Sequence, residues 1–137
     1  YIALLSVTFA ALTAFLATFI PSTSGFTALA TIVGTVMGFI AAIYVPMGIL
    51  PDGVANVISA LPFAIAAMLL RGPLTSGALA ELTGDNAGAR EVMESFYGLT
   101  LSVGEWTPTN AEAVFILLAV AAVFTLASLA RIRGRVR

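Results

Sequence analysis

The chain has 137 residues, of which 60% are hydrophobic and only 9% are charged, and its formal net charge is −1. Soluble globular domains carry charge on about 25% of their residues, and no charged residue precedes Asp52, so the composition excludes a soluble protein and predicts an integral membrane protein. The sequence has no cysteine or histidine, which excludes disulfides, thiol nucleophiles and Cys/His metal sites.

The first predicted span covers residues 1–20, which is about the length that a hydrocarbon core requires. It starts inside an apolar run at Tyr1, without an initiator methionine, so we expect the sequence to be a fragment of a longer protein. Residues 21–25 contain proline, glycine and hydroxyl residues, which end one helix and cap the next. So short a connection predicts an antiparallel second span.

The second predicted span covers residues 26–50, which are uncharged and would form a helix about 37 Å long. A row of small side chains follows one side of this helix, and a threonine row runs beside it. Rows of small side chains let another helix approach closely in lipid. Glycine and alanine are, however, also simply common in membrane helices. Pro46 should kink this helix or end its regular part. The predicted packing seam consists of Ala30, Gly34, Gly38 and Ala42.

Residues 54–70 form a third apolar stretch, which follows a turn at 51–53. Seventeen residues are at the lower limit for a span, and Pro62 lies inside them. The stretch either crosses the membrane as a barely long enough span or enters and leaves on one side as a broken pair of half-helices. We favour this re-entrant hairpin.

Residues 71–112 are polar and are expected to lie outside the membrane. Pro73 is predicted to begin a short helix through Leu82, and Asp85 to cap an amphipathic helix over 86–97 that packs on the protein's own helices. Arg71 is either an anchor at the membrane interface or a partner for an acid such as Glu81 or Asp85. In the second role it would anchor the outer cap on the re-entrant segment.

The third span is predicted over residues 113–130. Thr109 and Glu112 have the spacing of a capping box, and Trp106 suits the aromatic belt of a membrane. A basic end beside a span predicts a cytoplasmic carboxyl terminus, which places residues 51–112 on the extracytoplasmic side. These charges suit anionic lipid headgroups and are not expected to bind nucleic acid. The cytoplasmic anchor consists of Arg131, Arg133, Arg135 and Arg137.

No motif predicts chemistry. The acids lie outside the predicted spans without metal or acid–base spacing, residues 84–88 lack the acidic ladder of a calcium loop, and there is no Walker loop. We therefore expect neither an enzyme nor a cofactor or metal site. The predicted fold is all-α, a single transmembrane domain over 1–137 with three spanning helices, a re-entrant helical hairpin and an outer amphipathic helix.

Two stretches carry a resemblance to a known family: Tyr-Val-Pro-Met-Gly-Ile-Leu-Pro at 44–51 and Leu-Pro-Phe-Ala-Ile-Ala-Ala-Met-Leu-Leu-Arg at 61–71. With the helices around them, they resemble the carboxyl-terminal half of the permease subunit of a type-2 ATP-binding-cassette exporter. The first three helices of that family and its cytoplasmic coupling helix have no counterpart in the sequence.

The resemblance implies a permease homo- or heterodimer in the lipid bilayer, driven by a separate ATP-binding subunit and exporting an amphiphilic, drug-like, lipid or polysaccharide cargo. The segment over 54–97 would gate the exit, and the implied kink and gate positions are Pro46, Gly48, Pro51 and Pro62. The alternative is a small helical membrane protein with a structural or assembly role and no transport activity.

Overall fold

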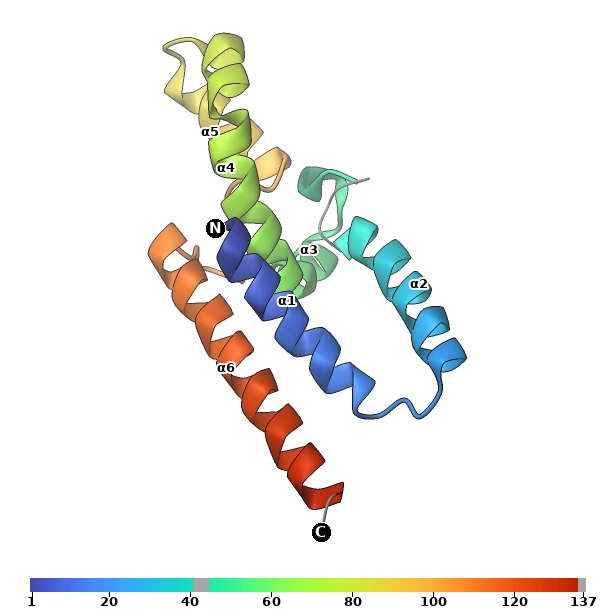
Figure 1. The fold of residues 1–137 in the computed structure, drawn as a ribbon. Helices are drawn as coiled ribbons and strands as arrows, with labels where there is room; N and C mark the ends of the chain where they lie inside the picture. The colour runs from blue at the N-terminus through green and yellow to red at the C-terminus, as the bar shows by residue number, and fades with distance from the viewer. Residues whose placement is uncertain (41–44, 136–137) are drawn as a thin grey trace. The chain divides into compact units, whose positions relative to one another are not determined.

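The computed structural model describes residues 1–40 and 45–135, and its named elements are all helical (Figure 1). This confirms the predicted all-α fold. In chain order the elements are α1 (Ile2–Ala17), α2 (Thr23–Ile40), the 3₁₀ turn η1 (Met47–Ile49), α3 (Asp52–Ser59), α4 (Pro62–Thr83), α5 (Ala87–Phe96) and α6 (Asn110–Arg135).

The chain packs as two compact units. Unit 1 consists of Tyr1–Val36 and Val114–Arg137, and unit 2 is the continuous segment Met37–Ala113. Unit 1 therefore contains α1, most of α2 and most of α6, whereas unit 2 contains η1, α3, α4 and α5. The assignment of the whole chain to one transmembrane domain stays a prediction.

In unit 1, α1 packs along α6 and the two helices run in the same direction (Figure 1). The Thr8 hydroxyl donates a hydrogen bond to the Leu117 carbonyl at 3.3 Å, and both residues are almost fully buried. Two turns further along each helix, the ring centroids of Phe15 and Phe124 lie 5.3 Å apart. Because residue numbers rise together along both helices, the pair is parallel.

Two of the described helices, α4 and α6, are long and apolar enough to cross a membrane. The predicted span over 113–130 lies inside the second of them, at Asn110–Gly134. The helix α1 and the Thr23–Val36 part of α2 are also apolar but shorter. Three spans with a re-entrant hairpin therefore stay a prediction.

The predicted central helix over 26–50 is wrong in both bounds. The helix α2 begins at Thr23 and its described part ends at Ile40, whereas Met47–Ile49 is a 3₁₀ turn. Pro46 explains why no α-helix continues here, because proline lacks the N–H that a helix needs and disfavours helical backbone in the residue before it. Pro46 itself is extended, with ψ at 143°.

In unit 2 the chain breaks before Pro62, as the sequence predicted. The helix α3 ends at Ser59, Leu61 is extended, and Pro62 is the first residue of α4. Proline suits this position because the first N–H groups of a helix have no partner within it. The two helices that result pack against each other.

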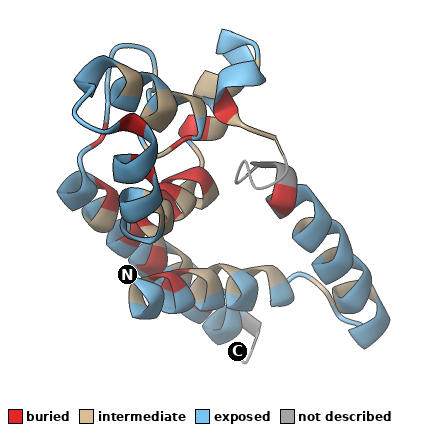
Figure 2. Cartoon of the chain, turned by 90° about the horizontal axis from the view of Figure 1, so that it is seen from above, coloured by how far each residue is buried: buried red, intermediate tan, exposed pale blue. Residues whose placement is uncertain are grey.

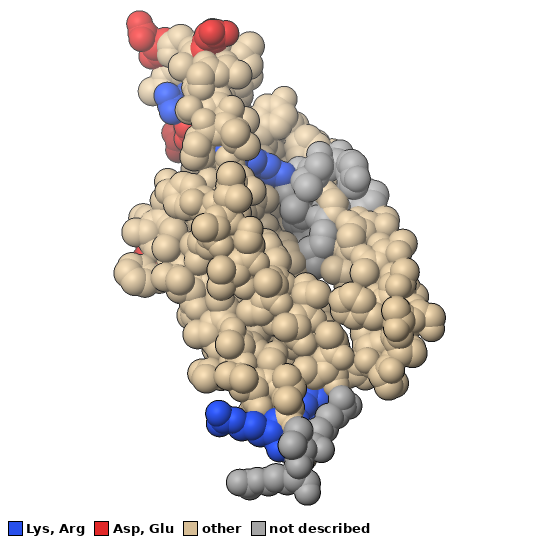
Figure 3. Space-filling model, viewed as in Figure 1, with Lys and Arg blue, Asp and Glu red and all other residues tan. Residues whose placement is uncertain are grey.

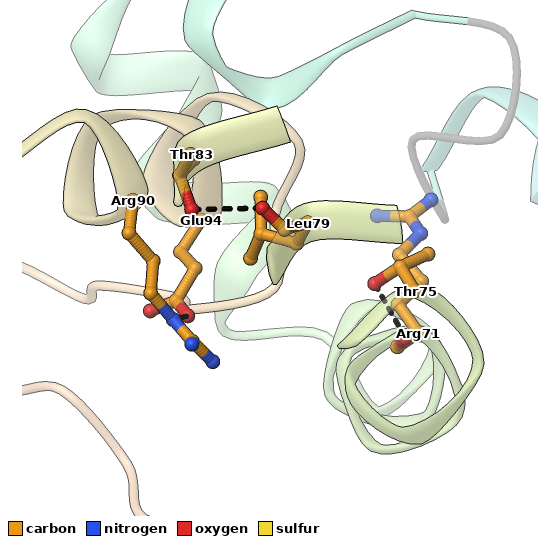
Figure 4. A network of polar contacts seen from close by, with 6 residues as sticks. All are labelled: Arg71, Thr75, Leu79, Thr83, Arg90 and Glu94. Atoms are coloured by element: carbon orange, nitrogen blue, oxygen red, sulfur yellow. Dashed lines mark hydrogen bonds and ion pairs between the residues drawn. The ribbon is translucent and has the colours of Figure 1, made fainter. Parts of the chain in front are cut away.

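The predicted end of this apolar run at 71–73 is wrong, because α4 continues through Pro73 to Thr83. A proline inside a helix removes the backbone donor that would bond to the carbonyl four residues earlier. Two hydroxyl side chains on the same part of α4 bond to other carbonyls of the helix. The Thr75 hydroxyl donates to the Arg71 carbonyl at 2.8 Å (Figure 4), and the Ser76 hydroxyl donates to the Pro73 carbonyl at 3.3 Å. The predicted separate helix from Pro73 to Leu82 is thus the second half of α4.

The amphipathic helix is α5, which packs on α4 and on η1 as expected for a helix covering the protein's own elements. Its cap is Asn86, whose side-chain oxygen accepts a bond from the Ala89 N–H at 3.0 Å, and not the predicted Asp85. Asparagine and aspartate cap about equally well, so the sequence alone did not separate these neighbours. Arg90 and Glu94 form an exposed ion pair of 2.8 Å on α5 (Figure 4).

The capping box before α6 is confirmed. A carboxylate oxygen of Glu112 accepts bonds from the Thr109 N–H at 2.7 Å and from its hydroxyl at 2.8 Å, and the Glu112 N–H donates to that hydroxyl at 3.3 Å. The helix extends to Arg135, beyond the predicted end at Ala130. Figure 3 shows arginine side chains at the carboxyl-terminal end of α6 and a group of acidic side chains around α5.

Candidate functional site

The proline-rich segment at 46–51 packs against the end of α5. Pro46 and Pro51 bracket η1, and both have φ near −60° and ψ near 140°. Extended prolines on either side confine this segment to one short turn. We call the group around the turn the Arg71 cluster; it consists of Met47, Gly48, Arg71, Phe96, Tyr97 and Gly98.

The Phe96 ring packs directly against Gly48. A Cβ atom on Gly48 would overlap Cδ2 of that ring and lie 3.0 Å from two further ring carbons. Any larger side chain at this position must therefore displace the ring. Glycine at position 48 thus allows η1 and α5 to approach each other closely.

Gly98 ends α5 in a Schellman motif. Its N–H donates to the Ser95 carbonyl at 3.1 Å, and the Leu99 N–H donates to the Glu94 carbonyl at 2.8 Å, which is the pairing that satisfies the last carbonyls of a helix. The motif requires a left-handed residue, and φ of Gly98 is +67°. A Cβ atom there would lie 2.8 Å from Met47 Cγ and 3.0 Å from the Arg71 guanidinium.

Arg71 connects α4 to the carboxyl-terminal end of α5. Its guanidinium donates a hydrogen bond to the Tyr97 carbonyl at 3.0 Å. A cation at the carboxyl end of a helix is also favoured by the helix dipole. Glu81, one of the predicted acidic partners, lies ten residues on, about 15 Å along α4, and the acidic pairing stays a prediction. Arg71 does fix the outer helix, but it does so through a main-chain carbonyl.

Gly98→Ala should lower the free energy of unfolding by about 1 kcal/mol more than Gly104→Ala. Both glycines have positive φ, at 67° and 63°, so both substitutions carry the left-handed backbone cost of about 1–2 kcal/mol. Only Gly98 has neighbours where the methyl group would go, because a Cβ on Gly104 meets nothing within 4 Å. Unfolding in detergent, followed by Trp106 fluorescence, measures both. Equal losses would mean that Met47 and Arg71 do not pack on Gly98.

A cavity of about 230 Å³ lies between α4 and α5. The exposed Arg90–Glu94 pair lines one side, and buried Met68 and Leu69 line another. In the part of the chain that the structure describes, no group of three acidic side chains is placed to hold a metal ion.

The predicted packing seam on α2 is largely uncovered. Ala30 and Gly34 are exposed, a Cβ on Gly34 would meet no described residue within 4 Å, Gly38 is buried, and Ala42 lies outside the described residues. Figure 2 shows exposed or intermediate colouring over most of α2. The neighbouring threonines bond back to their own helix: the hydroxyls of Thr27, Thr31 and Thr35 each donate to the carbonyl four residues earlier, at 3.0–3.1 Å.

The other predicted site residues are divided between the two units. Pro46, Gly48, Pro51 and Pro62 all lie in unit 2, where each proline stands at the start of a helical element. In unit 1, the Arg131 guanidinium lies 3.8 Å from the centroid of the Phe19 ring, which is a cation–π contact. Arg133 is exposed, Arg135 ends α6, and Arg137 lies outside the described residues.

Sequence reasoning missed Phe96, Tyr97 and Gly98 as site residues. One local signal was present, because a glycine just after a periodic helix predicts a left-handed cap. That signal locates the end of α5, but it does not reveal which residues approach it.

No match to this chain was found among models of protein families, curated proteins or solved structures.

Proposed function

We propose that this chain is the carboxyl-terminal part of the permease subunit of a type-2 ATP-binding-cassette exporter. One observation carries the proposal. The two stretches on which the resemblance rests, 44–51 and 61–71, meet in the Arg71 cluster, since Met47 of the first and Arg71 of the second both lie within about 3 Å of the Cβ position of Gly98. In this proposal the cluster holds the outer helix over the exit.

The parallel course of α1 and α6 supports a topology with an odd number of crossings. Neighbouring helices that run the same way must both cross in the same sense, so the chain between them must cross once more in the opposite sense. Of the helices between them, α3 and α5, with 8 and 10 residues, are too short to cross a bilayer. If α1 and α6 both cross, the proposal requires that one of α2 and α4 crosses as well.

We favour α2 as that crossing helix. It has no charged residue, whereas α4 contains Arg71 and Glu81, and a charged residue at the centre of a membrane helix costs about 2.5–3.5 kcal/mol on insertion scales. The hairpin of α3 and α4 would then enter and leave on the outer side. In the rival topology α4 crosses in place of α2.

Single cysteines separate these topologies, because the natural chain has none. We would substitute the exposed residues Ser22, Gly53, Asp85 and Gly134 one at a time and treat intact cells with a membrane-impermeant thiol reagent. If α2 crosses, positions 53 and 85 should be labelled, and positions 22 and 134 only after the cells are opened. Labelling of 85 without 53 would mean that α4 crosses and would contradict the re-entrant hairpin.

The exporter assignment itself requires a nucleotide-binding partner. A tagged full-length permease should co-purify with an ATPase subunit, and inverted vesicles that contain both should accumulate cargo only with ATP. A complex that assembles without any nucleotide-binding subunit would favour the structural or assembly role instead.

A further inference from the structure

Unit 2 contains a second cavity, of about 160 Å³, between η1, α3 and the segment that follows α5. Buried Met47 and Leu101 form part of its wall. We call this cavity the hydroxyl pocket after its polar residues, which are Asp52, Ser59, Ser95, Thr100 and Ser102.

The hydroxyl groups of this pocket differ from most others in unit 2. Three hydroxyl residues of α4 donate to carbonyls of α4 itself, and the Thr109 hydroxyl bonds to Glu112. Within the part of the chain that the structure describes, the four hydroxyl side chains of the pocket make no such bond. Hydroxyls without protein partners are thus concentrated in one cavity.

Ser59 is the decisive member of this group, because it is only 3% exposed. Each described side-chain nitrogen or oxygen that is sealed from solvent has a hydrogen-bond partner. Ser59 has none among the described residues, so its hydroxyl must keep some accessible surface, and the pocket that it lines is where that surface opens. A hydroxyl that faces the pocket without a protein partner can donate a hydrogen bond to, and accept one from, a polar group bound there.

We propose that the hydroxyl pocket binds a neutral polyol group, of the size of glycerol or a single sugar ring. Serine and threonine hydroxyls both donate and accept hydrogen bonds, and the Asp52 carboxylate accepts them, which matches the hydroxyls of a polyol. Met47 and Leu101 offer an apolar surface to its C–H groups. The negative charge of the Asp52 carboxylate disfavours the binding of an anion in this pocket.

The size of the pocket limits what can enter. Its volume of about 160 Å³ corresponds to about five waters at roughly 30 Å³ each, well below the roughly 300 Å³ at which drug-sized pockets begin. One ring or headgroup fits, whether it is free in solution or attached to a lipid. The inference concerns equilibrium binding and does not depend on the proposed export.

Trp106 provides a reporter for the binding experiment. It is the single tryptophan of the chain, and it pairs with Val103, next to Ser102 of the pocket. We would titrate the purified chain with methyl β-glucoside in dodecylphosphocholine, a detergent without a sugar headgroup. We expect a saturable change in fluorescence. Ser59→Ala should weaken binding about tenfold, the effect of losing one well-formed hydrogen bond.

Thr107→Ala is the matched control, because Thr107 is an exposed hydroxyl residue of the same unit outside the pocket. The affinity of this variant for the glucoside should stay unchanged. Ser102→Ala removes an exposed rim hydroxyl and should also weaken binding, which keeps the test informative if Ser59→Ala does not fold.

A parallel titration uses nanodiscs that contain a glucosyl lipid. Binding of the free sugar supports a soluble source, and binding of the lipid alone supports a headgroup. No binding of either, or equal losses in the Ser59 and Thr107 variants, would overturn the proposal.

Discussion

Gly48→Leu should destabilise unit 2 by about 3 kcal/mol, the upper end of what overpacking costs. The leucine side chain would occupy the position of the Phe96 ring, which overlaps the Cβ atom of any residue at 48. The ring must then leave its place between η1 and α5, and the contact that holds the turn to the outer helix is lost. Unfolding in mixed detergent, followed by Trp106 fluorescence, measures the change.

The double variant Gly48→Leu with Phe96→Ala tests the cause. Removal of the ring makes room for the leucine, so the two substitutions should cost less together than the sum of their single effects, with a coupling of about 1–3 kcal/mol. Additive losses would show that Gly48 and Phe96 are not in contact. Gly53→Leu serves as the control, because a Cβ on Gly53 meets nothing within 4 Å.

On the proposed export function, Gly34→Leu should abolish export by the full-length protein while the protein still inserts and folds. No described residue lies within 4 Å of a Cβ at this position, and leucine is a better helix former than glycine by nearly 1 kcal/mol. A loss of export would therefore report a helix outside the described chain that packs on the seam. ATP-dependent uptake into inverted vesicles measures export, and cysteine labelling shows whether the variant still inserts with the same topology.

Gly77→Leu is the matched control, since Gly77 is also an exposed helical glycine with open space around it. It should transport normally. Unchanged export in both variants would discard the seam, and a loss in both would mean that leucine at any exposed helical glycine impairs the protein.

The sequence predicted best those features that a few neighbouring residues determine. Pro62 begins a helix and Thr109 caps one, because the missing N–H of a proline and the reach of a capping hydroxyl act within one turn. Pro73 shows the limit of this reasoning. It has the same ring as Pro62, yet it lies inside α4. Burial of Leu79 and Thr83, which follow the proline, favours continuation of the helix.

The candidate site was less predictable, because its contacts depend on main-chain atoms from distant segments. The sequence singled out Arg71 as an anchor with an acid as one possible partner, and the guanidinium donates a hydrogen bond to the Tyr97 carbonyl. A carbonyl is present in every residue and has no sequence signature; this one is free to accept because it lies at the end of α5. The fit of Phe96 to Gly48 likewise depends on packing that no periodic pattern encodes.

The contact between Thr8 and Leu117 has a consequence for the order of events during synthesis. The two residues are 109 positions apart, which at about 5–20 residues per second is a delay of roughly 5–20 s. During that interval α1 has left the ribosome but its α6 partner has not. Unit 2 is continuous in sequence and can assemble within that interval, so the surface of α1 that binds α6 must be shielded by lipid or an insertion factor until the last helix arrives.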